Sequence, residues 1–525
     1  MEPANSLAFL RKNIKSFPHI QADHFESKGR GFRARKFIPS GTVVLHEDPI
    51  VSALLDDHID RRCSNPTCWK PKTELDEKAF LRCSICRYAF YCSKHCQHSH
   101  WKAHKFGCKC AQRMAAAIQK PPTPSILMMA EIWRRSELAQ ESQKLVVKCP
   151  EFPLFRDLNS HWDAFSEQQR HEYIGMACSV FYFMFAPDVK SSNSNDDEKK
   201  MNDIKPLETK LDVNCVARWF ARFSCNNFSI FDSELRPFGA GVFPLTAVFN
   251  HSCDPNCVLM FSNPDRPNRC YVRSSRPIAK GEELTIGYVE LGCPTSIRRA
   301  ELRKGYFFEC ECPRCSNDAD ELDAVWETLR CPSGNCSAVI PSTYDLDGLC
   351  PTCGTDLSEH NIDITLEKVA RLRNQGDEAR SSGQLLQAKT LFEKAYAALE
   401  LVRHANDPSV YTLLNSLAMT CVDLQLFDEA FTYHEAELPF LDFVHSEHAP
   451  ALGLQLLLHG KLACYLGHIS RALHLYRRAH IILCETHGKF HPLIEELAQK
   501  IGECQAELMQ NSGPAGREEL LAIHS

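Results

Sequence analysis

The chain has 525 residues, of which 44% are hydrophobic and 24% are charged, and its formal net charge is −6. This length and apolar content predict several domains with packed cores. The first residues lack a basic segment followed by an apolar core, and no apolar run is long enough to cross a bilayer, so we expect neither secretion nor membrane insertion. The acidic balance disfavours attraction of the whole surface to nucleic acid and leaves room only for a local basic patch.

Cysteine is unusually abundant, with 27 residues, and many of them stand in closely spaced pairs with histidines nearby. In a chain without a secretion signal, this pattern predicts zinc sites in a reducing compartment rather than disulfides. The four ligand sets described below use 15 cysteines. We expect the other twelve, including Cys178, Cys421, Cys464 and Cys484, to be small buried apolar residues.

The N-terminal segment predicts a short helix around residues 10–14 and then strands. Two glycines in Lys28–Ala34 predict a tight turn, and Pro-Ser-Gly within Phe37–Leu45 predicts a hairpin. Such a Gly-x-Gly is a weak signal on its own. It indicates either a plain hairpin turn or a turn whose glycines let the backbone approach a ligand closely.

Eight potential zinc ligands follow between residues 63 and 108, enough for two tetrahedral ions. Their spacing resembles a MYND finger, although four residues rather than the usual two separate the first pair. The resemblance implies interleaved pairs, with one ion held by Cys63, Cys68, Cys92 and Cys96, and the other by Cys83, Cys86, His104 and Cys108. Buried thiols without metal are the alternative.

Three further histidines of this segment, His95, His98 and His100, are expected at the surface or behind the ligands, because the ligand set is already complete. With Lys94, Lys102 and Lys105 they form a basic face. We favour a solvated face, and the alternative is a site for an acidic or nucleic-acid partner.

Residues 111–187 are predicted to be helical. Ile126–Ile132 has a helical apolar stripe, and His171–Phe185 is apolar on nearly every face, which predicts burial. Residues 189–211 are polar and charged, so we expect an exposed flexible loop. The apolar pattern resumes at Trp219–Ile230.

The segment Asn250–Cys257, with sequence Asn-His-Ser-Cys-Asp-Pro-Asn-Cys, predicts a sharp polar turn that offers Cys253 as a metal ligand. An apolar segment precedes it, the strand-like Glu283–Tyr288 follows, and Cys-x-Cys-x-x-Cys comes at residues 310–315. This series resembles the SET-domain protein-lysine methyltransferases. The resemblance implies S-adenosyl-L-methionine as cofactor and lysine side chains of proteins as substrates.

Site residues follow from the same resemblance. It implies catalytic roles for Tyr288, Tyr306 and Phe228, although an ordinary strand tyrosine is the alternative for Tyr288. The cofactor-binding residues that it implies are Lys28, Gly29, Arg30, His161, Asn226, Asn250, His251, Tyr288 and Phe308. Cys225–Phe228 is similar to a strand of the family that carries a cofactor-binding Asn and a pocket aromatic, and a simple helix-cap histidine is the alternative for His161.

Two more zinc sites are predicted after the turn. Cys253 with Cys310, Cys312 and Cys315 resembles the post-SET site, which would staple the end of the catalytic domain to the turn. Cys331, Cys336, Cys350 and Cys353 favour a zinc ribbon, with spare thiols as the alternative. We therefore predict four zinc ions, of which the last is the least certain from spacing alone.

From residue 361 onward the pattern is helical, and similar hexapeptides that end at Ala388, Ala430 and Ala472 recur every 42 residues. Each precedes an amphipathic segment. Repeated helix pairs of this kind predict a superhelical array resembling tetratricopeptide repeats, and an irregular bundle is the alternative.

The complete layout resembles the SET-and-MYND lysine methyltransferases and implies an α+β multidomain fold. Its expected parts are a first SET segment (1–62), the finger (63–108), the SET domain (109–290) with a helical insertion (about 115–212), the post-SET segment (291–316), the ribbon (317–358) and the repeats (359–525). The alternative is a non-catalytic adaptor with a vestigial SET fold. The presence of Tyr288 and of the Asn250-His251 pair favours the enzyme.

Partners and location follow from this layout as expectations. The substrates would be histone tails or cytoplasmic proteins, the finger and repeats would bind peptide partners, and nucleic acid would bind weakly if at all. We expect no membrane partner, a monomer, and a location in the cytoplasm and nucleus.

Overall fold

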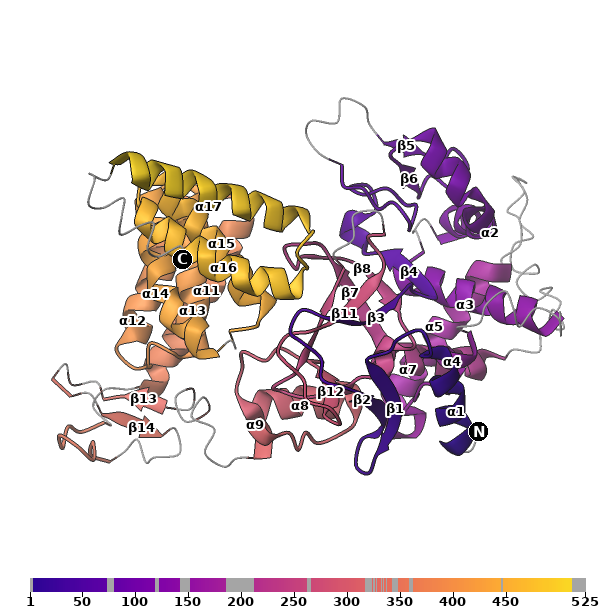
Figure 1. Cartoon of the computed structure of the whole chain (residues 1–525), viewed down its shortest axis with the longest axis horizontal. Coiled ribbons are helices and arrows are strands. Elements are labelled where there is room, and N and C mark those ends of the chain that lie inside the picture. The colour runs from indigo at the N-terminus through magenta and orange to yellow at the C-terminus, as the bar shows by residue number, and fades with distance from the viewer. Residues whose placement is uncertain are drawn as a thin grey trace, which may run out of the picture. The chain divides into compact units, whose positions relative to one another are not determined.

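The computed structural model describes residues 3–72, 80–118, 122–141, 152–185, 212–261, 266–316, 323, 326, 328–331, 333, 335–336, 338–341, 348–357, 362–444 and 447–511. The loop expected at 189–211 lies outside these residues. The chain divides into two compact units (Figure 1): Met1–His251, Asn256–Ile286 and Arg303–Phe308 form the first, and Ser252–Pro255, Gly287–Leu302 and Glu309–Ser525 form the second. Among the described helices, none combines the length and apolarity that a membrane crossing requires.

The first unit is built on small sheets whose strands come from distant parts of the chain. One sheet has the order β1 (Ile20–Phe25), β2 (Gly29–Ala34), β12 (Glu283–Ile286) and β9 (Asn250–His251). In it, β12 pairs antiparallel with β2 and parallel with β9, which sets Ile286 opposite His251. The sheet therefore joins the glycine-containing segment, the polar turn and the strand before Tyr288, as a single site requires.

Two three-stranded sheets complete the β core. The first has the order β10 (Cys257–Met260), β11 (Cys270–Ser274), β3 (Val43–Glu47), and the second has the order β4 (Val51–Leu54), β8 (Pro237–Val242), β7 (Asn227–Phe231). The finger adds the short pair β5 (Leu81–Arg82) and β6 (Phe90–Tyr91). Phe32 and Phe249, both fully buried, lie 4.7 Å apart between ring centroids and fill the space beneath β2.

Two turn predictions in this region were wrong. Gly29, at φ +76°, ends the tight turn between β1 and β2, but Gly31 lies inside β2 and not in a turn. Residues 37–45 do not form a hairpin, because Ile38 bridges to Ile278 while β3 pairs with β11. Gly41, at φ +73°, turns the chain from one partner to the other. Partners from far along the chain decide this pairing, and local turn residues do not reveal them.

Helices pack beside these sheets in the first unit: α1 (Pro3–Asn13), α2 (Lys94–Ile118), α3 (Pro124–Glu141), α4 (Phe152–Asp157), α5 (Glu167–Phe185) and α7 (Val213–Asn226). The expected helix at 10–14 is thus the end of α1, and the apolar stripe of 126–132 lies on α3. The fully buried Trp133 of α3 stands in edge contact with Phe181 of α5, with ring centroids 4.3 Å apart.

The prediction that 171–185 is buried all round was wrong. Only Ala177, Val180, Phe183 and Met184 of α5 are buried, because the helix packs on one side, and Cys178 is exposed. Of the other cysteines expected in a core, Cys421 is buried while Cys464 and Cys484 are half-buried. Trp219–Asn226 is helical, so Asn226 ends a helix and does not stand on a strand as expected. Phe228 does lie on a strand, β7.

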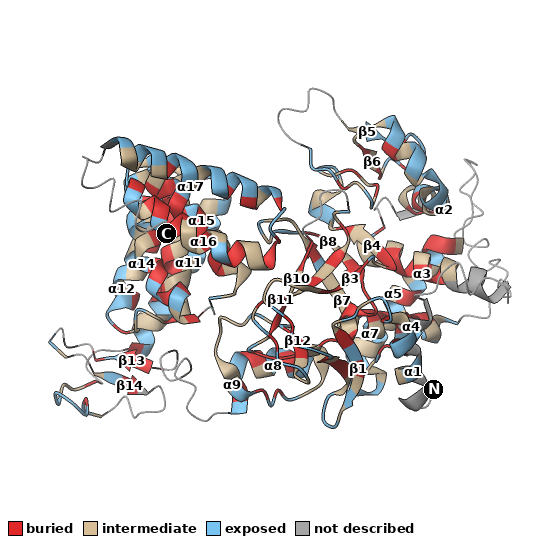
Figure 2. Ribbon diagram, viewed as in Figure 1, coloured by how far each residue is buried: buried red, intermediate tan, exposed pale blue. Residues whose placement is uncertain are grey.

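The second unit begins with short elements: the first part of α8 (Thr295–Tyr306), then α9 (Pro313–Ser316) and the hairpin β13 (Thr328–Arg330) and β14 (Val339–Pro341). The remainder is helical. It comprises α11 (Ile362–Ser381), α12 (Leu385–Glu400), α13 (Pro408–Asp423), α14 (Phe427–Val444), α15 (Pro450–Tyr465), α16 (Ile469–Thr486) and α17 (Pro492–Asn511). Figure 2 shows the buried faces of these helices turned toward one another.

The turns inside the helix pairs repeat closely, which confirms the array predicted from the 42-residue spacing. Gly383, Gln425 and Gly467 have φ values of +76°, +61° and +79°. In each turn the next N–H donates to a carbonyl five residues back at 2.8 Å, from Gln384 to Ala379, Leu426 to Cys421 and His468 to Ala463. This is the hydrogen bond that closes a Schellman motif. Ala388, Ala430 and Ala472 are all fully buried.

Candidate active site and zinc centres

The finger gathers its eight ligands into the two interleaved sets that the MYND resemblance implied. Zinc with bonds of about 2.3 Å to sulfur places tetrahedral ligands about 3.8 Å apart. The observed Sγ separations are 3.6 Å for Cys68–Cys92 and 3.4 Å for Cys92–Cys96 in one set. In the other set, Cys83 Sγ lies 3.7 Å from Cys108 Sγ and Cys86 Sγ lies 3.6 Å from His104 Nε2. Both sets therefore fit zinc.

His100 stands behind the second finger set, as predicted. Its Nδ1 lies 3.1 Å from the Tyr91 hydroxyl, and its ring centroid lies 5.7 Å from that of His104. Burial lowers the pKa of His104 to about 4, which keeps this imidazole in the neutral form that binds a metal. Neither His95 nor His98 belongs to a metal-binding cluster of the described residues.

The third set joins the polar turn to the segment after α8. Cys253 Sγ lies 3.5 Å from Cys315 Sγ and 4.0 Å from Cys310 Sγ, and with Cys312 all four thiols are buried. The fully buried Arg298 donates to Cys315 Sγ at 3.8 Å. Because four thiolates on one zinc leave a charge of −2, this guanidinium offsets a charge that water cannot reach. Arg298 also donates to the hydroxyl of Thr295, three residues earlier, at 2.5 Å. Sequence analysis did not identify Arg298.

The fourth set, Cys331, Cys336, Cys350 and Cys353, is also gathered at ligand distance. Cys331 and Cys353 are 3.5 Å apart at sulfur, and Cys336 and Cys350 are 3.9 Å apart. Cys331 directly follows β13, and the β13–β14 hairpin sets the spacing of the first pair. All four predicted ligand sets are thus assembled.

A chain of polar contacts links β9, β12 and the turn that precedes β2. Asn250 Nδ2 donates to Glu283 Oε1 at 2.9 Å, and Glu283 Oε2 accepts from Lys28 Nζ at 2.7 Å. A Cβ atom on Gly31 would stand 2.5 Å from Asn250 Nδ2, so only glycine leaves room for that amide. Sequence analysis assigned this glycine to a turn, either plain or close to a ligand, and did not foresee that it makes room for Asn250.

Arg30 and Asn226, two predicted cofactor-binding residues, converge on residues 157–159. Arg30 donates to the Asp157 carbonyl at 2.8 Å, and Asn226 Nδ2 donates to the Asn159 carbonyl at 2.9 Å. This segment leads directly to His161, so the structure brings Arg30, Asn226 and His161 to one region although nearly 200 residues of sequence separate the outer two.

His161 is in the left-handed region, at φ +47°, and it makes no side-chain cap hydrogen bond to the short helix that follows. His161 therefore stands at the helix-cap position, as in the alternative, but its ring does not provide the cap. Its ring stacks on Phe307, with centroids 5.4 Å apart and planes at 26°, and Phe307 itself has φ +62°. Two such residues in contact are a feature of functional sites, where surrounding structure holds strained backbone. Phe307 was not predicted, although it lies between two predicted site residues, Tyr306 and Phe308.

His251 is buried at the end of β9, with its ring centroid 6.1 Å from that of Phe308. Asn256 joins the polar turn that follows His251 to β12. Its side chain donates to the Glu283 carbonyl at 2.8 Å and accepts from Thr285 N–H at 2.9 Å. Asn256 was predicted only as a turn residue. Its buried amide in fact fixes the register between the turn and β12.

The three predicted catalytic residues are spread over both units. Phe228 on β7 is half-buried, in edge contact with Phe243 at 6.0 Å between centroids. Tyr306 is the last residue of α8. Tyr288 belongs to the second unit, is half-buried and follows the end of β12 by two residues.

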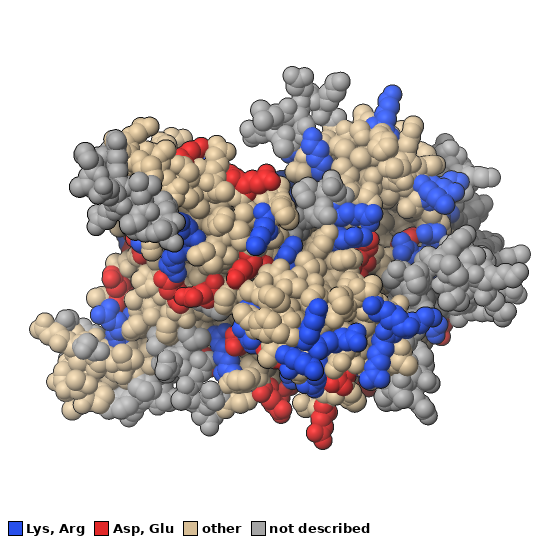
Figure 3. Space-filling view, viewed as in Figure 1, with Lys and Arg blue, Asp and Glu red and all other residues tan. Residues whose placement is uncertain are grey.

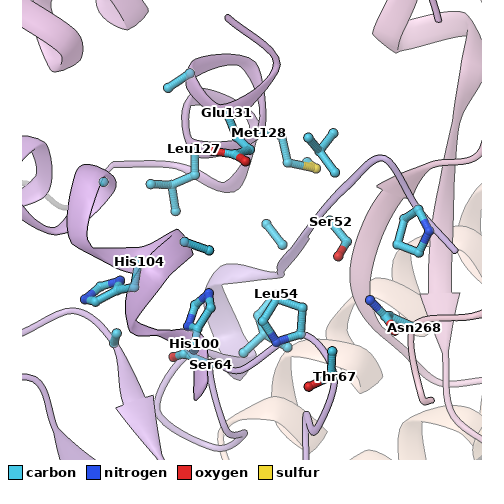
Figure 4. Close-up of a pocket in the computed structure, with 18 of the residues that line it drawn as sticks. Ser52, Leu54, Ser64, Thr67, His100, His104, Leu127, Met128, Glu131 and Asn268 are labelled. Atoms are coloured by element: carbon cyan, nitrogen blue, oxygen red, sulfur yellow. The ribbon is translucent and has the colours of Figure 1, made fainter. Parts of the chain in front are cut away.

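A cavity of about 440 Å³ lies elsewhere in the first unit. Figure 4 shows His100 and His104 of α2, Leu127, Met128 and Glu131 of α3, and Ser52 and Leu54 of β4 around it. None of the predicted catalytic or cofactor-binding residues lines this cavity. It is therefore separate from the candidate active site.

Comparison with known proteins agrees with this geometry. The family model for the SET domain matches residues 29–289. The histone-lysine N-methyltransferase ASHR1 of Arabidopsis thaliana is 29% identical over 508 residues, covering 93% of this chain and 96% of its own length. The histone-lysine N-methyltransferase SMYD3 of Homo sapiens is 27% identical, covering 92% and 96%. The N-lysine methyltransferase SMYD2 of Sus scrofa is 24% identical, covering 90% and 96%.

The split β core, the polar turn and the matched residues define a SET-domain protein. The finger, the third zinc set and the repeats extend the similarity over nearly the whole chain. Residues 29–289 thus form a SET domain, and over nearly its whole length the chain is similar to protein-lysine methyltransferases of the SMYD type. SET-domain methyltransferases use S-adenosyl-L-methionine. These comparisons favour an enzyme over an adaptor.

Proposed function

We propose that this methyltransferase binds S-adenosyl-L-methionine on the β2–β9–β12 strands and transfers its methyl group to a protein lysine held by Tyr288, Tyr306 and Phe228. The observation that carries this proposal is the union of three distant segments in one sheet, with Asn250 opposite Thr285 and His251 opposite Ile286. Each of these segments carries one of the motifs by which the sequence resembled the family.

The residues present fit the cofactor. Gly31 leaves room for the Asn250 amide, and Lys28, Arg30, Asn226 and Asn250 supply charged and amide donors suited to an amino-acid carboxylate. His251, with Phe308 beside it, offers an aromatic surface for adenine, and His161 with Phe307 offers another. When bound, the cofactor supplies a methyl group on a positively charged sulfur.

The roles of the aromatic residues follow from the chemistry. Direct displacement needs the lysine nitrogen neutral, free of water and in line with the methyl group. Two residues of chain span at most about 7 Å, so connectivity keeps Tyr288 near the end of β12. There its hydroxyl would accept a hydrogen bond from the lysine nitrogen and orient it, while the rings of Tyr306 and Phe228 would enclose the side-chain stem.

Substitution of Tyr288 by Phe tests this proposal. We expect methyl transfer to fall on the order of a hundredfold or more, because one oriented hydroxyl can contribute a few kcal/mol to the transition state. Transfer of radiolabelled methyl to lysate proteins measures the rate, and a titration of cofactor binding should be unchanged. The matched control is Tyr271→Phe on β11, which should keep wild-type activity. Wild-type activity of Tyr288→Phe would remove Tyr288 from the mechanism.

The substrates are proposed to be proteins with accessible lysines, in the cytoplasm and nucleus, where thiolate zinc sites persist. Two of the relatives are named as histone-lysine methyltransferases and a third as an N-lysine methyltransferase, so both histones and other proteins are candidates. Acidic and basic side chains both occur on the face in Figure 3, with Lys and Arg gathered over β1 and β12. Mass spectrometry of labelled bands would identify the substrates.

The repeats are proposed to select protein partners. Repeat arrays present extended surfaces to peptides, and this one exposes 69% of Leu386 and 71% of Tyr465. Leu386→Glu with Tyr465→Glu in the full chain should change the set of labelled proteins while cofactor binding stays the same. An unchanged set labelled at unchanged rates would contradict a role of these residues in selection.

A further inference from the structure

The helical repeats contain a buried cluster without cysteine. His434 and Glu437 lie one helical turn apart on α14, and His459 lies on α15. His434 Nδ1 is 3.3 Å from Glu437 Oε2, and His459 Nε2 is 3.5 Å from the same oxygen. The two imidazole centroids are 4.2 Å apart, and all three side chains have no exposed surface. Three potential ligands thus converge from two helices.

These separations suit a metal better than direct hydrogen bonds. Charge-assisted hydrogen bonds between nitrogen and oxygen are about 2.7–2.9 Å long, shorter than both contacts. Zinc bound to nitrogen and oxygen at about 2.0–2.1 Å places tetrahedral ligands about 3.3–3.4 Å apart, close to both. In addition, His434 Nε2, Glu437 Oε1 and both ring nitrogens of His459 have no hydrogen-bond partner among the described residues.

The neighbouring repeats show that polar side chains are not needed at these positions. The positions 42 residues before and after His434 are occupied by Phe392 and Tyr476. The corresponding positions for Glu437 are occupied by Ala395 and Ala479. All four residues are buried. His459 corresponds to the buried Leu417 of the preceding repeat. Of the described repeats, only the middle one and the last one therefore bring three polar side chains together, where α14 meets α15, at a cost that apolar side chains avoid.

The carboxylate needs a positive partner. Taking the Glu437 carboxylate wholly out of water is costly unless a positive charge accompanies it, and a cation bound by the three side chains would supply that charge.

We propose that His434, Glu437 and His459 bind a divalent transition metal, zinc in the first instance, which clamps α14 to α15. Two imidazoles and a carboxylate are ligands that suit zinc and Fe(II) more than Mg²⁺ or Ca²⁺. The described residues supply three ligands, so a water molecule completes the tetrahedron. This site is additional to the four cysteine-containing sets, and it does not depend on the proposed catalytic roles.

Metal content of the full-length protein tests the proposal. Wild type, His459→Asn and Glu437→Gln are dialysed against zinc and then against metal-free buffer, and zinc per chain is measured by elemental analysis. Each variant should hold one zinc fewer than wild type. The matched controls are His474→Asn, at an exposed site on α16, and Glu435→Gln on α14, and both should equal wild type. Equal zinc in wild type and in natively helical His459→Asn and Glu437→Gln overturns the proposal.

A second measurement on wild type decides the case where these variants fail to fold. The protein is treated with a weak chelator that leaves the thiolate sites loaded, and Co²⁺ is then added. We expect visible d–d bands without thiolate-to-metal charge transfer, because this site contains no sulfur. No new band, or a charge-transfer band alone, overturns the site. Retention of anaerobically added Fe(II) in place of zinc supports the same site with a different ion.

Discussion

The β core of the first unit and the helical repeats of the second are stabilised over very different distances along the chain. Lys28 pairs with Glu283 across 255 residues, and Arg33 donates to the Gly281 carbonyl across 248. In the repeats, the turn that starts each second helix is closed by a hydrogen bond to a carbonyl only five residues back. Local signals therefore suffice to predict the repeats, whereas the core takes its form from partners that no local pattern reveals.

Loss of one zinc ligand in the finger should give the largest difference in stability between the β core and the repeats. Cys92→Ser removes a ligand that lies 3.4 Å from Cys96 and 3.6 Å from Cys68 in the finger. We expect one zinc to be lost per chain and the finger to unfold, because zinc contributes about 10–16 kcal/mol to the folding of small zinc domains. Elemental analysis and hydrogen exchange measure both effects. The control Cys178→Ser, at an exposed thiol on α5, should retain all zinc, and full zinc in Cys92→Ser would exclude this ligand set.

A cavity in the repeats should have a smaller and local effect. Phe392 is fully buried against Gly376, where a Cβ would stand 2.5 Å from the ring. Phe392→Ala should destabilise the repeats by about 3–5 kcal/mol. Urea unfolding followed by helical circular dichroism should show this loss while cofactor binding remains.

The matched variant in the core is Phe32→Ala, which removes the ring packed 4.7 Å from Phe249. Phe32→Ala should destabilise the first unit by a similar amount, and unlike Phe392→Ala it should also reduce cofactor binding. If Phe392→Ala impairs the cofactor site equally, the two regions unfold as one and the contrast between them is wrong.

Glu47 is a buried polar residue of the core, and its substitution should lower the free energy of unfolding by about 2 kcal/mol. Its buried carboxylate accepts from Leu245 N–H at 2.9 Å, from Thr246 N–H at 2.8 Å and from the Thr246 hydroxyl at 2.9 Å, across nearly 200 residues. Glu47→Gln keeps the size but cannot accept on both sides. The melting temperature of the first unit should fall while that of the repeats stays constant. A similar loss from Glu435→Gln, at a half-buried carboxylate on α14 that pairs with Arg471, would argue against a special role of the long-range bonds.

The smallest expected effect is a gain in stability. Gln425 has φ +61° at the position where the other two repeats have Gly383 and Gly467. A residue with a side chain loses about 1 kcal/mol or more in this conformation. Gln425→Gly should therefore stabilise the middle repeat by about 1 kcal/mol, and Gly467→Ala should destabilise the last repeat by a similar amount. Chemical unfolding of both variants would show whether local backbone conformation limits the repeats.

The sequence predicted the architecture and the four cysteine-containing ligand sets because each has a local signature. Zinc ligands must come in short-spaced pairs, and the repeats keep the same residues every 42 positions. The pairing of β3 with β11 was missed because Pro39–Gly41 suggested a local hairpin. The one-sided burial of α5 was missed because its apolar content is high on every face.

The candidate site was only partly predictable. His251 and Asn250 lie where the motif implied, but Phe307 and Arg298 have no motif and act through contacts made by the folded chain. The cluster of His434, Glu437 and His459 could have been found by aligning the three repeats, since it breaks an apolar pattern. Searching for cysteine-rich spacing overlooks it, because His and Glu one turn apart are common on helix surfaces.

The pairing of β2 with β12 also bears on synthesis of the protein. Strand β2 leaves the ribosome about 250 residues before β12, which at about 5–20 residues per second is a delay of roughly 10–50 s. Until then one edge of β2 has no partner, and unpaired strand edges promote association with other chains. A nascent chain stalled before residue 283 should therefore aggregate or recruit chaperones, and it should gain cofactor binding only when translation passes β12.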